Sequence, residues 1–273
     1  MSEIDYTLVV GVDDWHFRQL CLTWPTWKKH KPSLLEHPMV IFNYHRVNLP
    51  PETPTELILE KIDHPHLKVV RWPIKGLSVD EEADWNKENK FGSPHREVML
   101  SGFVYVPALF VNTKYWFKLD TDVVATGNDN WIDPSWFKND PAIVAHRWTF
   151  TRPPDQILKM DAWVEKNKDK LPASVTENEP LKLAPPPGWD RVGHKRIISW
   201  CGFFDTEWTF QMSSLTQQED ERYRLPVPSQ DGYLWYMAKR MGRGIVRVNM
   251  KSLGWQHWHT WGNVEKHARE AMR

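Results

Sequence analysis

The stretch YWFKLDTD, residues 115–122, decides the fold expected of this chain. Its first five residues are mostly apolar, as in a buried strand, and they lead directly into Asp120-Thr121-Asp122. Two carboxylates at positions i and i+2 at a strand end can point the same way, toward one cation. Oxygen ligands favour Mg²⁺ or Mn²⁺. An Asp-x-Asp triplet arises roughly once by chance in a chain of this size. Its place at a strand end therefore carries the argument, since ligands gather at strand carboxyl ends in α/β sheets.

Strands and helices alternate on the N-terminal side of this stretch. Short apolar runs predict strands, and apolar residues at helical spacing predict helices. The expected elements are a strand at 4–12, a helix at 15–29, a strand at 38–44, a helix at 56–61 and a strand at 67–70. A further helix is expected from Ser93 to Phe103, to be ended or kinked by Pro107. Strands that alternate with helices imply a parallel sheet.

The C-terminal side continues this pattern with one long interruption. Strands are expected at 142–146 and 197–204, with a helix at 156–166 between them. A Pro-rich stretch at 170–195 follows that helix and contains Trp189. We interpret it either as an acceptor-side flap or as disorder, because a loop this long in a compact domain is usually one of the two. Residues 264–273 are typical of a short charged helix with a solvated face.

Composition indicates one domain and excludes several classes of protein. Lys plus Arg and Asp plus Glu both number 35, so nothing favours tight binding to nucleic acid or to an anionic membrane. The acidic N-terminus has no basic flank before an apolar run, and no apolar stretch is long enough to cross a bilayer, so a cytoplasmic protein is expected. Cys21 and Cys201 lie far apart without metal-type spacing, which argues against zinc and a disulfide framework.

Tryptophan is unusually frequent, with 17 residues in 273. Its side chain offers a flat apolar face and one N–H donor. That face suits a sugar ring, although most of these residues are expected to fill the core. The surplus favours a carbohydrate ligand.

The Asp-x-Asp triplet after a hydrophobic strand in mid-chain resembles the GT-A fold of nucleotide-sugar glycosyltransferases. The resemblance spans about 4–259, and its specific motifs cover a small part of that range. It implies an α/β fold with a Rossmann-like mixed sheet, mostly parallel, flanked by helices, and a C-terminal acceptor-side region. The expected organisation is one domain, 1–273, with a nucleotide-binding half at 1–125, an acceptor and catalytic half at 126–262 and a tail at 263–273.

The same resemblance implies a site for Mn²⁺ or Mg²⁺ on the donor diphosphate. Asp122 is expected as the direct metal ligand, and Asp120 as the partner that reaches the ribose or a metal-bound water. In Gly254-Trp255-Gln256-His257-Trp258-His259, His257 resembles the late histidine that completes this site, with His259 as the alternative. For the two aspartates, the competing interpretation is a turn in which both are exposed. For the histidine, it is a packed, hydrogen-bonded residue between two tryptophans.

A second acidic motif lies at Ser229-Gln230-Asp231-Gly232, where it opens a helix. In inverting members of the resembled family the acid of this motif is the catalytic base, which implies that role for Asp231. Gln230 departs from the usual Glu and leaves Asp231 as the only carboxylate. The alternative is structural, because Ser229 suits a helix cap and a negative charge is favourable in the first turn.

Five further residues are assigned to donor binding by their positions. Arg96 matches a basic residue that contacts the nucleotide or diphosphate in relatives, and Gly202 lies in a strand that faces donor and acceptor there. A glycine at that point lets the backbone approach a ligand closely. The others follow the first two strands, where the family holds the base: Val12, Asp13 and Asn43.

Together these features predict a metal-dependent glycosyltransferase that moves a sugar from a nucleotide-sugar, with UDP-sugar as the default, to a carbohydrate or other hydroxyl acceptor. Inversion depends on Asp231 acting as general base. A nucleotidyltransferase is the nearest alternative, but Gly11-Val12-Asp13-Asp14-Trp15 supplies no Gly-rich phosphate loop. A non-catalytic sugar-binding module is the second alternative, and tryptophan abundance alone supports it.

Overall fold

Seven strands form the central sheet of the computed structural model, which describes residues 4–43, 53–71, 106–152, 155–171, 173–178, 192–216 and 230–273. The strands lie in the order β3-β2-β1-β4-β7-β6-β8. Their bounds are β1 Tyr6–Val12, β2 Met39–Asn43, β3 Leu67–Arg71, β4 Tyr115–Leu119, β6 Ile143–Arg152, β7 Val192–Asp205 and β8 Ile245–Val248. β3, β2, β1 and β4 are parallel, and β6 is parallel to β8. β7 runs antiparallel to both neighbours, so the sheet is mixed and mostly parallel, as predicted.

Two very short strands, β5 (Val123–Ala125) and β9 (Trp255–His257), pair antiparallel in a second sheet. Neither was predicted, because three residues show no periodicity. Gly254, directly before β9, has φ +88; its N–H donates to the Lys251 carbonyl in the preceding turn, and its carbonyl accepts the Thr126 N–H at 2.7 Å. A Cβ at this position would lie 2.0 Å from the Thr126 carbonyl oxygen, so only glycine fits here.

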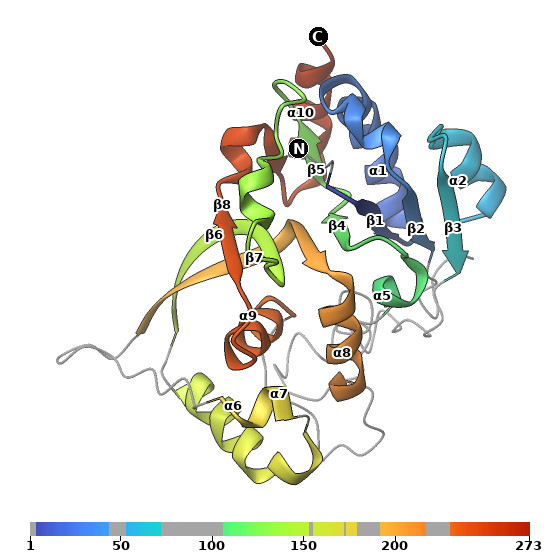
Figure 1. Cartoon of the computed structure of the whole chain (residues 1–273). Coiled ribbons are helices and arrows are strands. Elements are labelled where there is room, and N and C mark those ends of the chain that lie inside the picture. Colours follow the sequence, from blue (N-terminus) through green and yellow to red (C-terminus); the bar gives the residue numbers. More distant parts are fainter. Residues whose placement is uncertain are drawn as a thin grey trace.

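Helices cover both faces of the large sheet (Figure 1). Their bounds are α1 Asp14–His30, α2 Thr55–Lys61, α5 Val106–Phe110, α6 Asp155–Lys166, α7 Ala173–Thr176, α8 Thr206–Thr216, α9 Gln230–Arg240 and α10 Trp261–Met272. Short 3₁₀ turns occur at Pro32–Glu36, Pro134–Phe137, Lys168–Lys170 and Met250–Leu253. In Figure 1, α1 and α10 lie together beside β5, and α6, α8 and α9 lie at the opposite end.

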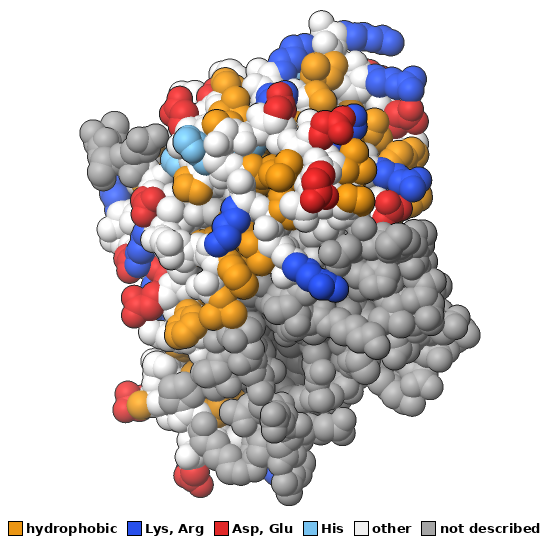
Figure 2. Space-filling model, turned by 90° about the vertical axis from the view of Figure 1, so that its right-hand side faces the viewer, with side chains coloured by type: hydrophobic (Ala, Val, Ile, Leu, Met, Phe, Trp, Pro, Cys, Tyr) orange, Lys and Arg blue, Asp and Glu red, His pale blue; other side chains and the backbone are white. Residues whose placement is uncertain are grey.

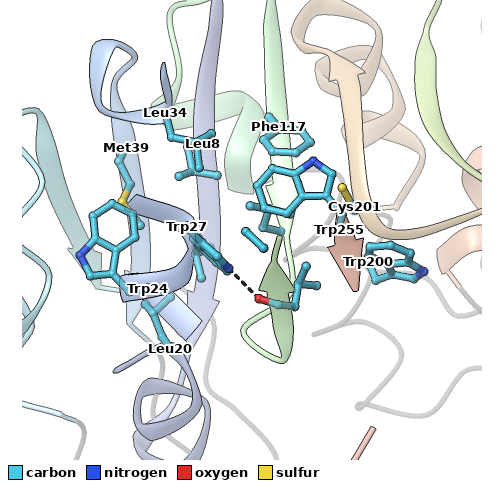
Figure 3. Close-up of a cluster of buried hydrophobic side chains, with 14 of the residues drawn as sticks. Leu8, Leu20, Trp24, Trp27, Leu34, Met39, Phe117, Trp200, Cys201 and Trp255 are labelled. Carbon is cyan, nitrogen blue, oxygen red and sulfur yellow. Dashed lines mark hydrogen bonds between the residues drawn. The ribbon is translucent and has the colours of Figure 1, made fainter. Parts of the chain in front are cut away.

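Each face of the sheet has its own hydrophobic core because side chains alternate along a strand. In β4, Trp116 joins the core that includes α8 and α9, whereas Phe117 joins the core of α1 and β9. Figure 3 shows the second core, in which Trp27, Phe117 and Trp255 come from three different elements. Most of the tryptophans whose side chains are described fill these two cores. Eight are buried: Trp24, Trp27, Trp116, Trp131, Trp200, Trp208, Trp235 and Trp255.

Three predictions on either side of β4 compare differently with the structure. Pro107 is the second residue of α5, and the helix predicted from Ser93 to Phe103 falls outside the described residues, so the effect of Pro107 on that helix stays a prediction. The predicted loop at 170–195 is shorter than expected, because α7 forms within it and β7 begins at Val192 against Arg152. Trp189 lies outside the described residues, so the flap interpretation stays a prediction.

The C-terminal helix α10 has one packed side in addition to its solvated face. Val264 and Ala268 are buried, and α10 packs against α1 and β5. The His30 ring lies 2.8 Å from the Ala271 carbonyl oxygen, and the His267 ring stacks on Trp258 with centroids 3.8 Å apart. Val264 and Ala268 lie four residues apart on one face, and this short apolar stripe is enough to bury one side of a charged helix.

The surface agrees with the balanced composition. On the face shown in Figure 2, acidic and basic side chains of the described residues are interspersed, with hydrophobic side chains between them. No helix in the described ranges combines the length and apolarity needed to span a membrane.

Candidate metal and donor site

A tight turn follows β4 and carries the two aspartates. The Val123 N–H donates to the Asp120 carbonyl at 3.2 Å, closing the turn. The middle residue, Thr121, is buried and donates its hydroxyl to Gln19 of α1 at 2.9 Å. The Thr23 hydroxyl of α1 donates to the Thr121 carbonyl at 2.9 Å. Helix α1 therefore anchors the centre of the turn, while the aspartates on either side stay partly exposed.

The ladder between β5 and β9 brings His257 to this turn. His257 is the register partner of Val123, and the Trp258 N–H donates to the Asp122 carbonyl at 3.2 Å. His257 Nε2 lies 3.1 Å from Asp122 Oδ1. The ring of His259 lies 4.4 Å from that of His257, and the potential ligand atoms of all three residues lie within 4.8 Å of one another. The structure thus brings Asp122 together with both histidines considered from the sequence.

The Asp122 carboxylate has an unsatisfied oxygen that fits a bound cation. Oδ1 is buried and accepts no hydrogen bond in the described part of the chain, and its polar neighbour is His257 Nε2, 3.1 Å away. A buried oxygen without a donor is costly. Two ligands at about 2.1 Å from an octahedral cation lie about 3 Å apart, close to the spacing seen here. One carboxylate with two imidazoles suits Mn²⁺ better than Mg²⁺, which prefers oxygen ligands.

Asp120 is held differently and stands apart from this cluster. Its carboxylate pairs with the buried ammonium of Lys118, and its N–H donates to the Trp200 carbonyl at 3.0 Å. The potential ligand atoms that gather are those of Asp122, His257 and His259, without Asp120. Direct coordination by Asp120 stays a prediction that this geometry does not favour. Lys118 was missed in the sequence, although its i and i+2 spacing to Asp120 places both on one side of the strand.

Val12, Asp13 and Asn43 lie along the same carboxyl edge of the sheet, since β1 pairs with both β2 and β4. Asp13 Oδ1 caps α1 by accepting from the His16 N–H at 2.7 Å, so this carboxylate has a structural role. The Asn43 amide donates to the Thr53 carbonyl at 2.7 Å. Its Oδ1 is buried and has no hydrogen-bond partner in the described ranges, which leaves an acceptor at this edge.

The described part of the structure does not bring the other three residues assigned from the sequence into this site. Arg96 lies outside the described residues. Helix α9 begins at Gln230, as the acidic motif predicted, but the side chain of Asp231 is not among those described. A Cβ at Gly202 would lie 2.7 Å from the Ala145 Cβ on β6, so the space beside this glycine is filled by the neighbouring strand and not left for a ligand.

Trp200 is a residue of this site that the sequence did not predict. It precedes Cys201 and Gly202 in β7. The register of β7 against β4 places it beside the turn that carries Asp120 and Asp122. Its carbonyl binds the Asp120 N–H, and its ring stacks on His257. A local sequence pattern cannot reveal these two contacts, because both join segments that are distant in the chain.

Comparison with known proteins identifies the fold. No model of a protein family matches the chain, and no curated protein does either. Among solved structures, core-mannan synthase A from Aspergillus fumigatus, in its Mn/GDP form, superposes with a TM-score of 0.57 at 13% identity, covering 87% of this chain and 70% of that one. The mannosyltransferase Ktr4p from S. cerevisiae in complex with GDP gives 0.50 at 13% identity, over 93% and 71%. The chain therefore has the GT-A fold that the sequence predicted.

Proposed function

We propose that this chain is a metal-dependent glycosyltransferase that transfers a sugar from a nucleotide-sugar to a hydroxyl acceptor. The observation that carries the proposal is the cluster of Asp122, His257 and His259 at the carboxyl edge of a GT-A sheet, in which the potential ligand atoms lie within 4.8 Å of one another. Ligands of open α/β sheets bind outside this edge. The two similar structures are named as a mannan synthase and a mannosyltransferase, which supports the same class of reaction here.

In the proposed reaction, a divalent cation held by Asp122, His257 and His259 would neutralise charge on the departing nucleoside diphosphate. The chain's own residues fix the rest of the donor. Asp120, held by Lys118 and by the Trp200 carbonyl, is oriented to bind the ribose. Asn43 Oδ1, which accepts no hydrogen bond within the described ranges, is proposed to face the base. The donor thus lies along the edge from β2 to β4.

The identity of the base is the first open choice within this proposal. UDP is the default from the sequence, whereas both similar structures are described with GDP. A nucleoside diphosphate of either kind presents the same diphosphate to the Asp122 cluster, so the metal site does not discriminate between them. Base recognition is proposed for Asn43 and its neighbours, and both nucleotides belong in the test.

Stereochemistry is the second open choice, and it depends on Asp231. If this carboxylate removes the proton of the acceptor hydroxyl as that oxygen attacks the anomeric carbon, the configuration inverts. A retaining enzyme on this fold would keep the same metal site. Analysis of the anomer in the product, by NMR, distinguishes the two outcomes directly.

The β1–α1 connection argues against a nucleotidyltransferase. β1 ends at Val12 and α1 begins at Asp14, so one residue joins them and no Gly-rich phosphate loop can form. The carboxylate of Asp13 caps the helix, and this negative charge makes the helix start unfavourable for phosphate. A non-catalytic sugar-binding module would not require an unsatisfied carboxylate beside two histidines.

The test is release of nucleoside diphosphate from UDP- and GDP-sugars, with Mn²⁺ and with EDTA. We expect nucleoside diphosphate to be released from at least one donor when Mn²⁺ is present and not when EDTA is present. Asp122→Ala should lose this release. Asp133→Ala is the matched control, because Asp133 is an exposed aspartate that caps a 3₁₀ turn and is not one of the three clustered residues. Metal-independent release, or full activity in Asp122→Ala, would contradict the proposal. Pyrophosphate release from a nucleoside triphosphate and a sugar phosphate would instead indicate a nucleotidyltransferase.

A further inference from the structure

The ring of His257 is oriented by stacking and not by a hydrogen bond. It lies parallel to the indole of Trp200, with an interplanar angle of 5° and ring centroids 5.2 Å apart. A histidine that binds a metal almost always donates its other ring N–H to a carboxylate, a carbonyl or water. Within the described ranges, His257 has no such hydrogen bond, and its ring contacts are Trp200, His259 and Asp122.

Trp200 is itself held firmly on its remaining sides. Its side chain is 4% exposed, and its backbone lies in β7 beside β4. Its indole also contacts the ring of His146, with centroids 4.9 Å apart and a tilt of 46°. His146 Nδ1 accepts the Met250 N–H at 3.1 Å, which fixes that ring to the turn preceding β9. The indole is therefore a rigid surface on which the His257 ring rests.

We propose that Trp200 is a positioning residue that sets the plane of the His257 ring, so that Nε2 points to the cation position beside Asp122. β9 is only three residues long, and its backbone alone leaves the imidazole free to rotate about two side-chain bonds. Because the Trp200 carbonyl also binds the Asp120 N–H, one residue orders both sides of the site. This inference rests on the metal site of the proposed function.

The test measures binding of Mn²⁺ alone, without nucleotide, from the electron paramagnetic resonance signal of the free ion. Trp200→Leu removes the flat ring and is expected to weaken Mn²⁺ binding about tenfold, within the range typical of groups that orient metal ligands. Trp200→Phe retains a flat ring and is expected to stay within about threefold of the wild type. Trp200→Met is the second variant without a flat ring, for use if Trp200→Leu does not fold.

Trp208→Leu is the matched control for loss of a buried indole. Trp208 is fully buried in α8, in the core on the other face of the sheet, so its loss lowers stability without touching His257. Equal weakening in Trp208→Leu and Trp200→Leu would overturn the proposal, because it would reflect general destabilisation. Wild-type affinity in Trp200→Leu would also overturn it.

Asp122→Ala separates this inference from the proposed function. If Asp122→Ala loses Mn²⁺ binding while Trp200→Leu retains it, the metal site stands and the positioning role of Trp200 is wrong. If the wild type binds no Mn²⁺, or Asp122→Ala binds it normally, both proposals are overturned. Weakening in Trp200→Leu, recovery in Trp200→Phe and loss in Asp122→Ala together support both.

Discussion

Asp122 Oδ1 and His257 Nε2 lie 3.1 Å apart, although one follows β4 and the other ends β9 near the C-terminus. The contact depends on the three-residue ladder between β5 and β9, in which Val123 pairs with His257. This ladder would be unstable alone, since short two-stranded ribbons are marginal in water. The site is therefore only as well ordered as the packing of α1 and α10 against this ladder.

Asp122→Ala is expected to abolish metal-dependent nucleotide binding and to leave the melting temperature nearly unchanged. The carboxylate supplies a buried oxygen without a donor, so its removal takes away a metal ligand and no hydrogen bond of that oxygen. Calorimetry with UDP or GDP, each with Mn²⁺, measures the first effect, and thermal unfolding the second. Unchanged nucleotide affinity would remove Asp122 from the metal site.

Gly254→Ala is expected to lower stability by more than the cost of its positive φ. A Cβ there would meet the Thr126 carbonyl oxygen at 2.0 Å, so β9 would have to shift and carry His257 with it. Gly127→Ala is the control, because Gly127 has φ +76 but open space around its Cβ position. That control should cost only about 1–2 kcal/mol. Thermal unfolding and Mn²⁺ titration of both variants check this, and equal losses would show that the clash is relieved cheaply.

Because of Lys31, the free energy of unfolding is expected to rise at alkaline pH. This lysine is fully buried and donates to the Leu253 carbonyl at 2.8 Å and to the Asn128 carbonyl, and burial lowers its pKa to about 8. Between pH 8 and 10.5, the unfolded chain keeps the lysine proton and the folded chain loses it, so the free energy of unfolding increases with pH in that window.

The matching variant is Lys31→Met, which keeps the length of the side chain without the amine. Its stability relative to the wild type should fall progressively as the pH rises from 8 to 10.5, because only the wild type gains from deprotonation. Chemical denaturation at several pH values measures this difference. A difference that does not change with pH would show that Lys31 keeps an ordinary pKa in the folded protein.

Asp231→Asn is expected to lower sugar transfer by at least about a hundredfold with nucleotide affinity nearly unchanged, because loss of a general base typically costs ~10²–10⁴ in rate. As an acid in the first turn of α9 it would instead contribute only about 0.3–1 kcal/mol to stability. Turnover, nucleotide affinity and melting temperature on one preparation separate these roles. Near-normal transfer would mean that Asp231 is not the base and that inversion has lost its support.

Local sequence patterns predicted the parallel part of the sheet because its strands are buried on both faces. Such strands read as continuous apolar runs, as in β1, β2 and β4, and the helices α1 and α6 show helical spacing. The same patterns could not give the length of β7 or the packing of α10. The length of β7 depends on its pairing with β6, and the segments against which α10 packs are distant in the chain.

For the site, the sequence by itself determined that two aspartates follow a buried strand and that a histidine-rich segment lies near the C-terminus. Only the tertiary structure decided that Asp122 meets His257 and His259 while Asp120 pairs with Lys118. It also placed Trp200 between the turn after β4 and His257. The reason is physical: a ligand set is a matter of distances within a few ångströms, and these follow from strand register between segments far apart in the chain.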